Sequence, residues 1–79
     1  MLLVSAPINF VENNGNWEVH GGNGEYLGLI TKNPNDSRLM DPGKWFLSLY
    51  GEDEALYGYG PFETLDDAKA EVLAHVELV

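Results

Sequence analysis

The residues best suited to chemistry in this chain are carboxylates, and the densest group is three consecutive acids, Glu52, Asp53 and Glu54. Two carboxylates catalyse proton transfer only when burial or a fixed neighbour makes one of them hold its proton more tightly than the other. Three charged residues in a row are typical of a turn in contact with water, which provides neither condition. We therefore predict that this cluster has no role in acid–base catalysis.

The closely spaced glycines Gly22, Gly24 and Gly28 suggest a phosphate-binding loop as an alternative. Their spacing differs from that of the GxGxxG motif, and the residues that follow predict a strand. A phosphate loop needs the N-terminus of a helix at that point, because the free backbone N–H groups there bind the anion. The glycines instead favour a hairpin turn.

Metal and nucleophile motifs are also absent from the sequence. His20 and His75 are its only histidines and lie far apart, there is no cysteine, and the polar residues of the 33–41 segment do not follow the calcium-loop spacing. No GxSxG nucleophile motif occurs. We predict no bound metal, no cofactor and no enzymatic activity.

The charge of the chain limits its partners. The 79 residues include 13 acids and 4 bases, which gives a net charge of −9, while 44% of the residues are hydrophobic. Residues 1–44 hold five of the acids and three of the bases, so most of the excess lies in residues 45–79. Such a surface repels nucleic acids and anionic membranes and attracts basic protein surfaces. Direct binding to nucleic acid or membrane is not expected.

Two explanations of this acidic excess remain open. Asp66 and Asp67 fall in the first turn of a predicted helix, where the helix dipole favours negative charge. No local effect explains the 52–54 cluster and Glu63 against the single base Lys69 of this half. The excess serves solubility alone, or it forms an electronegative binding face.

Tyrosines beside the acidic turn favour a binding face. Tyr57 and Tyr59 share one face of a predicted strand, opposite Leu56, and Tyr50 ends the preceding strand. Any of these rings that points outward provides rigid contact area bordered by carboxylates, although packing within the sheet is the alternative. This combination suits an arginine-rich partner.

The elements that position these residues can be read from the hydrophobic pattern. Alternating or continuous apolar residues, separated by glycine- and asparagine-rich turns, predict short strands. The segments are 8–11, 17–20, 26–31, 45–50 and 55–59. Residues 33–44, which include Arg38, form a long loop rich in proline and asparagine. Gly28, inside a strand, indicates a bulge or a close backbone approach.

A helix is expected near the C-terminus. Thr64 is suited to cap its N-terminus, with Asp67 at the third helical position. The residues expected to face the sheet are Leu65, Ala68, Val72, Leu73 and Val76. The fold class is therefore α+β, a single domain over residues 1–79 with an antiparallel sheet of three to five strands and one C-terminal helix packed on one face. The absence of cysteine, and an apolar start too short for a signal peptide, favour the cytoplasm.

In profile, the chain resembles the small, acidic, cysteine-free α+β inhibitors encoded by phages, which include anti-CRISPR proteins and other DNA mimics. The acidic turn at 52–54, Glu63, and the helix acids Asp66, Asp67 and Glu71 carry this resemblance, and residues 60–68 also follow a strand-to-helix pattern common in small phage and bacterial proteins. The resemblance covers about a quarter of the chain. It implies a cytoplasmic inhibitor whose carboxylates imitate phosphates and block a nucleic-acid-binding channel, such as that of a CRISPR effector.

The resulting hypothesis is a non-enzymatic protein that binds a basic surface of a host defence complex. The alternative is a small structural or adaptor module that docks or dimerises through a sheet face or edge. The expected partner-binding residues are Glu52, Asp53, Glu54, Tyr57, Tyr59, Glu63, Asp66, Asp67 and Glu71.

Overall fold

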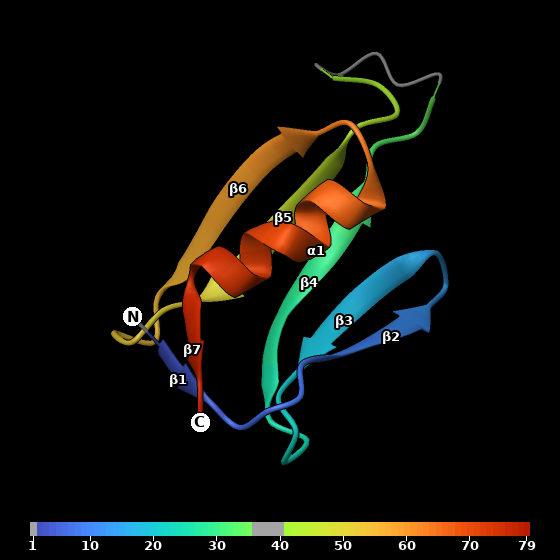
Figure 1. Cartoon of the computed structure of the whole chain (residues 1–79). Helices are drawn as coiled ribbons and strands as arrows, with labels where there is room; N and C mark the ends of the chain where they lie inside the picture. Colours follow the sequence, from blue (N-terminus) through green and yellow to red (C-terminus); the bar gives the residue numbers. More distant parts are fainter. Residues whose placement is uncertain (1, 36–40) are drawn as a thin grey trace.

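The computed structural model describes residues 2–35 and 41–79, and Figure 1 shows their arrangement. Five strands form an antiparallel sheet in the order β2-β3-β4-β5-β6. Their bounds are β2 (Asn9–Asn13), β3 (Asn16–His20), β4 (Tyr26–Lys32), β5 (Trp45–Tyr50) and β6 (Leu56–Phe62). The predicted antiparallel sheet is confirmed. Arg38, expected in the loop between β4 and β5, lies outside the described residues.

Tight turns connect the strands where the sequence has asparagine and glycine. Between β2 and β3, Asn14 and Gly15 both have positive φ, at 54° and 85°. Two such residues form a turn whose twist matches that of the flanking strands, and asparagine and glycine adopt it at little cost. The alternation of side chains along each strand then places Val19, Ile30 and Leu47 on the same face of the sheet.

Gly28 allows β4 and β5 to approach closely, as the sequence predicts. A Cβ atom added at this position would lie 2.1 Å from the carbonyl oxygen of Ser48. The register between β3 and β4 also shifts beside this point, between Val19 and His20. A side chain at position 28 would therefore force the central strands apart.

One helix, α1 (Leu65–Ala74), covers one face of the sheet and contacts β4, β5 and β6. Thr64 caps it, since the Thr64 Oγ1 accepts a hydrogen bond of 3.1 Å from the backbone N–H of Asp67. The helix ends at His75, whose N–H donates to the carbonyl of Val72. The predicted start of the helix at Thr64 is confirmed.

Two details of the predicted helix are wrong. Val76 is buried, but it lies in a strand that follows the helix. The spacing of four residues from Val72 continues the helical pattern, although the helix has already ended. Leu73 does not face the sheet, because 55% of its surface is exposed.

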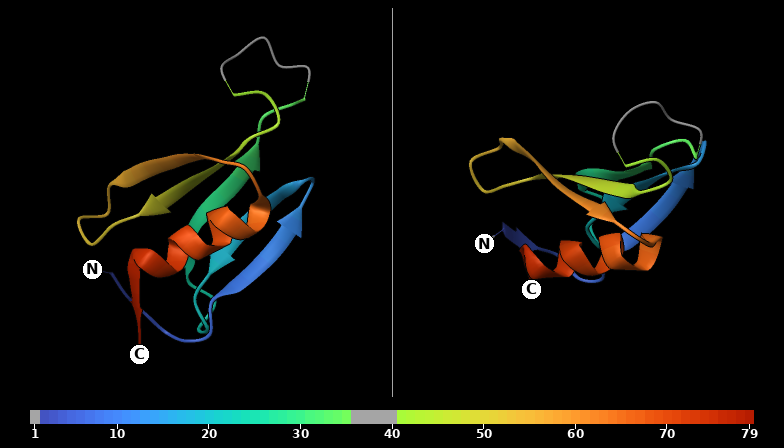
Figure 2. Two further views of the ribbon diagram at one scale, coloured as in Figure 1. Left: turned by 45° about the horizontal axis from the view of Figure 1, so that its top comes forward. Right: turned by 90° about the horizontal axis from the view of Figure 1, so that it is seen from above.

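A second sheet, which the sequence did not predict, joins the two ends of the described chain. It consists of two parallel strands, β1 (Leu2–Val4) and β7 (Val76–Leu78). Figure 2 shows that this pair and α1 lie on the same side of the five-stranded sheet. The opposite face of that sheet has no helix or strand over it within the described residues.

The core lies between the large sheet and the layer formed by α1, β1 and β7. Its buried side chains are Val4, Val19, Leu27, Ile30, Leu47, Leu49, Ala68, Val72 and Val76. Among the described residues, no polar or charged side chain is buried. None of the described helices combines the length and the apolar character needed to cross a bilayer.

The orientation of α1 predicts opposite effects at two adjacent residues. Val72→Asp would bury a charge against the sheet, and we expect it to remove most of a stability of about 5–15 kcal/mol. Leu73→Asp, its matched control on the exposed side, should cost about 1 kcal/mol or less. Urea unfolding of both variants measures the difference. Equal loss of stability in the two variants would mean that the helix is rotated from this orientation.

Candidate functional site

A groove of about 370 Å³ opens at one end of the molecule, where the turn between β5 and β6 meets the C-terminal end of α1. Its walls combine tyrosine and histidine rings with the carboxylates of the turn. The lining residues are Leu2, Leu49, Tyr50, Gly51, Glu52, Asp53, Tyr57, Tyr59 and His75. Four of the residues predicted to bind a partner therefore lie together here, and Glu54 belongs to the same turn.

Asp53 and Tyr57, which both line the groove, are joined by a hydrogen bond. The Tyr57 hydroxyl donates a hydrogen bond of 2.5 Å to the Asp53 carboxylate, which also accepts one of 3.1 Å from the Ala55 N–H. The bond from Tyr57, followed by that from Ala55, lowers the pKa of Asp53, and the same carboxylate raises the pKa of Tyr57. Asp53 therefore stays ionised while it holds the tyrosine ring in place.

Gly51 makes room for that ring. A Cβ atom at position 51 would lie 2.9 Å from Cε2 of Tyr57. Any larger residue would push the ring away from the turn. Glycine at position 51 therefore lets the Tyr57 ring lie against the turn.

The opposite wall of the groove comes from the end of the helix. The rings of Tyr59 and His75 stack, with centroids 4.2 Å apart and an angle of 26° between their planes. His75 Nε2 lies 2.9 Å from Oε2 of Glu71, four positions earlier in the chain. Because α1 runs back along the sheet, its C-terminal end lies at the groove. Glu71 does not line the groove itself but contacts His75, which does. Sequence reasoning did not include His75 among the binding residues, since only the fold brings it to Tyr59.

Tyr50 differs from the other two tyrosines. It borders the groove, but its ring contacts that of Tyr26, with centroids 6.3 Å apart. The buried Leu49 faces the helix, so the next residue along the strand points to the opposite face of the sheet. The groove therefore receives mainly the rings of Tyr57 and Tyr59.

A second acidic group lies where β6 leads into α1. Asp66 and Asp67 are exposed in the first helical turn. Glu63 forms an ion pair with Lys44, which compensates its charge. The seven residues of β6 separate this group from the acidic turn by roughly 20 Å, more than the Debye length of about 8 Å. The acidic turn and the acids at the start of α1 are therefore two separate groups.

The other two lysines in the described part of the chain lie over aromatic rings. Lys69 extends from the helix over Phe10 and Trp17, at 5.1 Å and 4.6 Å from the ring centroids. Lys32 lies 5.6 Å from the centroid of Trp45. These contacts hold both ammonium groups away from the groove, so neither lysine neutralises the acidic turn.

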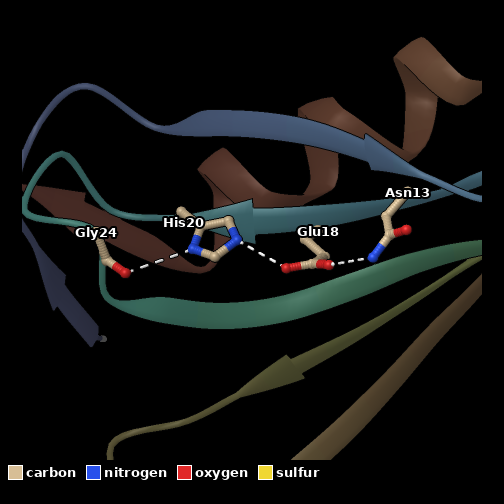
Figure 3. A network of polar contacts seen from close by, with 4 residues as sticks. All are labelled: Asn13, Glu18, His20 and Gly24. Carbon is tan, nitrogen blue, oxygen red and sulfur yellow. Dashed lines mark hydrogen bonds and ion pairs between the residues drawn. The ribbon is translucent and has the colours of Figure 1, made fainter.

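A polar network occupies β3 on the face away from the helix (Figure 3). Glu18 accepts a hydrogen bond of 3.1 Å from Asn13 and lies 3.0 Å from His20 Nε2, and His20 Nδ1 lies 3.4 Å from the carbonyl oxygen of Gly24. The bond from Asn13, followed by that from His20, lowers the pKa of Glu18. The network ties the β2–β3 hairpin to the following turn.

Neither a cluster of metal-binding side chains among the described residues nor similarity to other proteins points to an activity. Within residues 2–35 and 41–79, no three side chains of the metal-binding types gather around one point. Comparison of the chain with protein-family models, with curated proteins and with solved structures finds no match. The groove and the acidic groups are therefore the features of this protein that bear on its function.

The bond between Asp53 and Tyr57 predicts a change in tyrosine titration. Asp53→Asn should lower the pKa of Tyr57 towards 10.0, because the nearby negative charge is removed. Since the pKa of Tyr57 is raised in the folded state, the bond contributes its full stability below about pH 10, and this contribution is lost as pH rises above 10 through the raised folded-state pKa. Site-resolved NMR titration measures the pKa. Tyr26, whose pKa is raised mainly by burial, is the internal control and should not respond. An unchanged pKa for Tyr57 would contradict the bond.

Proposed function

We propose that this protein is a non-enzymatic acidic binding protein that blocks a basic, nucleic-acid-binding surface of another protein. The observation that carries the proposal is the acidic turn beside two tyrosine rings, with a second acidic group at the far end of β6. Carboxylates at fixed spacing imitate the phosphates of a nucleic acid strand, and lysine and arginine bind both groups.

The positions of the lysine side chains support this proposal. Lys44 pairs with Glu63, and Lys32 and Lys69 lie over aromatic rings. Lys32 and Lys69 thus lie away from the acidic turn, and Lys44 compensates one acid, Glu63, in the second acidic group. Like charges at this density oppose folding, which a basic partner would relieve.

Within this class, we propose a host defence complex as the partner, and in particular a CRISPR effector. The support is the resemblance of the acidic turn and the helix acids Asp66 and Asp67 to phage-encoded DNA mimics. In this reading the protein acts in the host cytoplasm and contacts no nucleic acid itself. A guide-loaded effector mixed first with this protein should then bind less labelled target duplex in a gel-shift assay.

The alternative is an adaptor that docks through its sheet. The edge strand β2 contains neither lysine nor proline, residues that commonly protect edges from pairing, and Val11 in it is 50% exposed. Pairing at this edge depends on backbone hydrogen bonds and apolar contact. It would therefore be weakly sensitive to salt, whereas binding through the acidic surface would be strongly sensitive.

Charge reversal on a capture column tests the proposal. Wild-type protein is immobilised, nucleic-acid-binding proteins are captured from a bacterial lysate, and elution is followed with rising salt and with added duplex DNA. Glu52→Lys should weaken binding of the captured protein about tenfold at low salt, with a smaller loss at high salt. Reversal of Asp66 and Asp67 together should act in the same direction.

Glu12→Lys is the matched control, because Glu12 is exposed on β2 at the opposite edge of the sheet. It makes the same change in net charge and should leave binding within about twofold of wild type. Duplex DNA should release the captured protein. Equal effects of Glu52→Lys and Glu12→Lys, or retention that DNA does not disturb, would refute the proposed function.

A further inference from the structure

The groove has a chemistry more specific than negative charge. Its acidic side is the turn, where Asp53 is held by Tyr57 and by the Ala55 N–H, and its apolar side is formed by tyrosine rings and Leu49. A ligand that fills it must present a positive charge and a flat or apolar surface together. The carboxylates of the turn, together with the negative net charge of the chain, disfavour an anionic ligand here.

The positions of the rings distinguish between the cationic side chains. Tyr57 is fixed at its hydroxyl, so its ring cannot rotate away, and Tyr59 is backed by the stacked ring of His75. A guanidinium group is planar, is weakly hydrated and stacks on aromatic rings while its N–H groups donate in the plane to carboxylates. A lysine ammonium is strongly hydrated and cannot stack in this way.

We infer that this groove binds the side chain of an arginine on the partner protein, with the guanidinium group against Tyr57 and its N–H groups directed at Glu52 and Asp53. The inference rests on the proposed function, since it names the residue of the basic surface that the groove recognises. It adds a specificity that phosphate imitation alone does not require, namely a preference for arginine over lysine. Asp53 keeps acceptor capacity for this, because a carboxylate has about four lone-pair sites and two are used.

Three short peptides test the inference on the intact protein. They are acetyl-Gly-X-Gly-amide with arginine, lysine or citrulline at X, and binding is followed through the backbone amide signals in an NMR titration. The arginine peptide should shift the signals of Gly51, Tyr57 and Tyr59 and bind about fivefold more tightly than the lysine peptide. The citrulline peptide, which has a similar shape without the charge, should produce no saturable shift.

Two pairs of variants locate the site. Tyr57→Leu removes a ring from the groove, and Tyr26→Leu removes a ring from outside it. The two side chains are similarly exposed, Tyr57 to 45% and Tyr26 to 46%. Asp53→Asn and Glu12→Gln make the matching comparison for charge and leave the packing of the core untouched. Arginine binding should fall about fivefold or more in the first member of each pair and stay unchanged in the second.

The results separate this inference from the proposed function. Equal affinity for arginine and lysine peptides, or shifts that map outside the groove, overturn the arginine site even if the capture column still responds to DNA and to Glu52→Lys. Arginine binding in the groove, together with capture that DNA does not disturb, supports the arginine site and refutes only the blocking of a nucleic-acid-binding surface.

Discussion

The packing of one ten-residue helix against one face of the sheet is the interaction on which the rest of this structure depends. A helix of this length is marginal in water by itself, so α1 persists because Ala68 and Val72 are buried against the strands. The same packing brings His75 to Tyr59 and starts β7 where it can pair with β1. Both the wall of the groove and the second sheet are therefore consequences of helix docking.

The small core also explains where the charges lie. A domain of 79 residues buries a modest fraction of its surface, and here the buried side chains of the described residues are all apolar. The acids must therefore lie on the surface, where their mutual repulsion opposes the compact state. The structure offsets little of this with its lysines, because Lys32 and Lys69 lie over aromatic rings.

The sequence predicted the parts of the fold that depend on local signals. Alternating residues predicted the strands, Asn14 and Gly15 the hairpin turn, and Thr64 the start of the helix. It did not predict β1 and β7, because three-residue strands carry little pattern and their pairing joins opposite ends of the chain. In the candidate site, the nearness of the acidic turn to Tyr57 was predictable, since Tyr57 is only four positions after Asp53. The contribution of His75 was not, because it depends on the helix running back along the sheet.

We propose that the end of the molecule formed by the β5–β6 turn meets a surface that nucleic acid also occupies. Amide hydrogen exchange of the captured complex tests it most directly, because it maps the contact without altering any residue. We expect slowed exchange in Gly51 to Tyr59 and at the start of α1, with this protection lost when duplex DNA is added. Protection centred on β2 and β3, and unaffected by DNA, would contradict it.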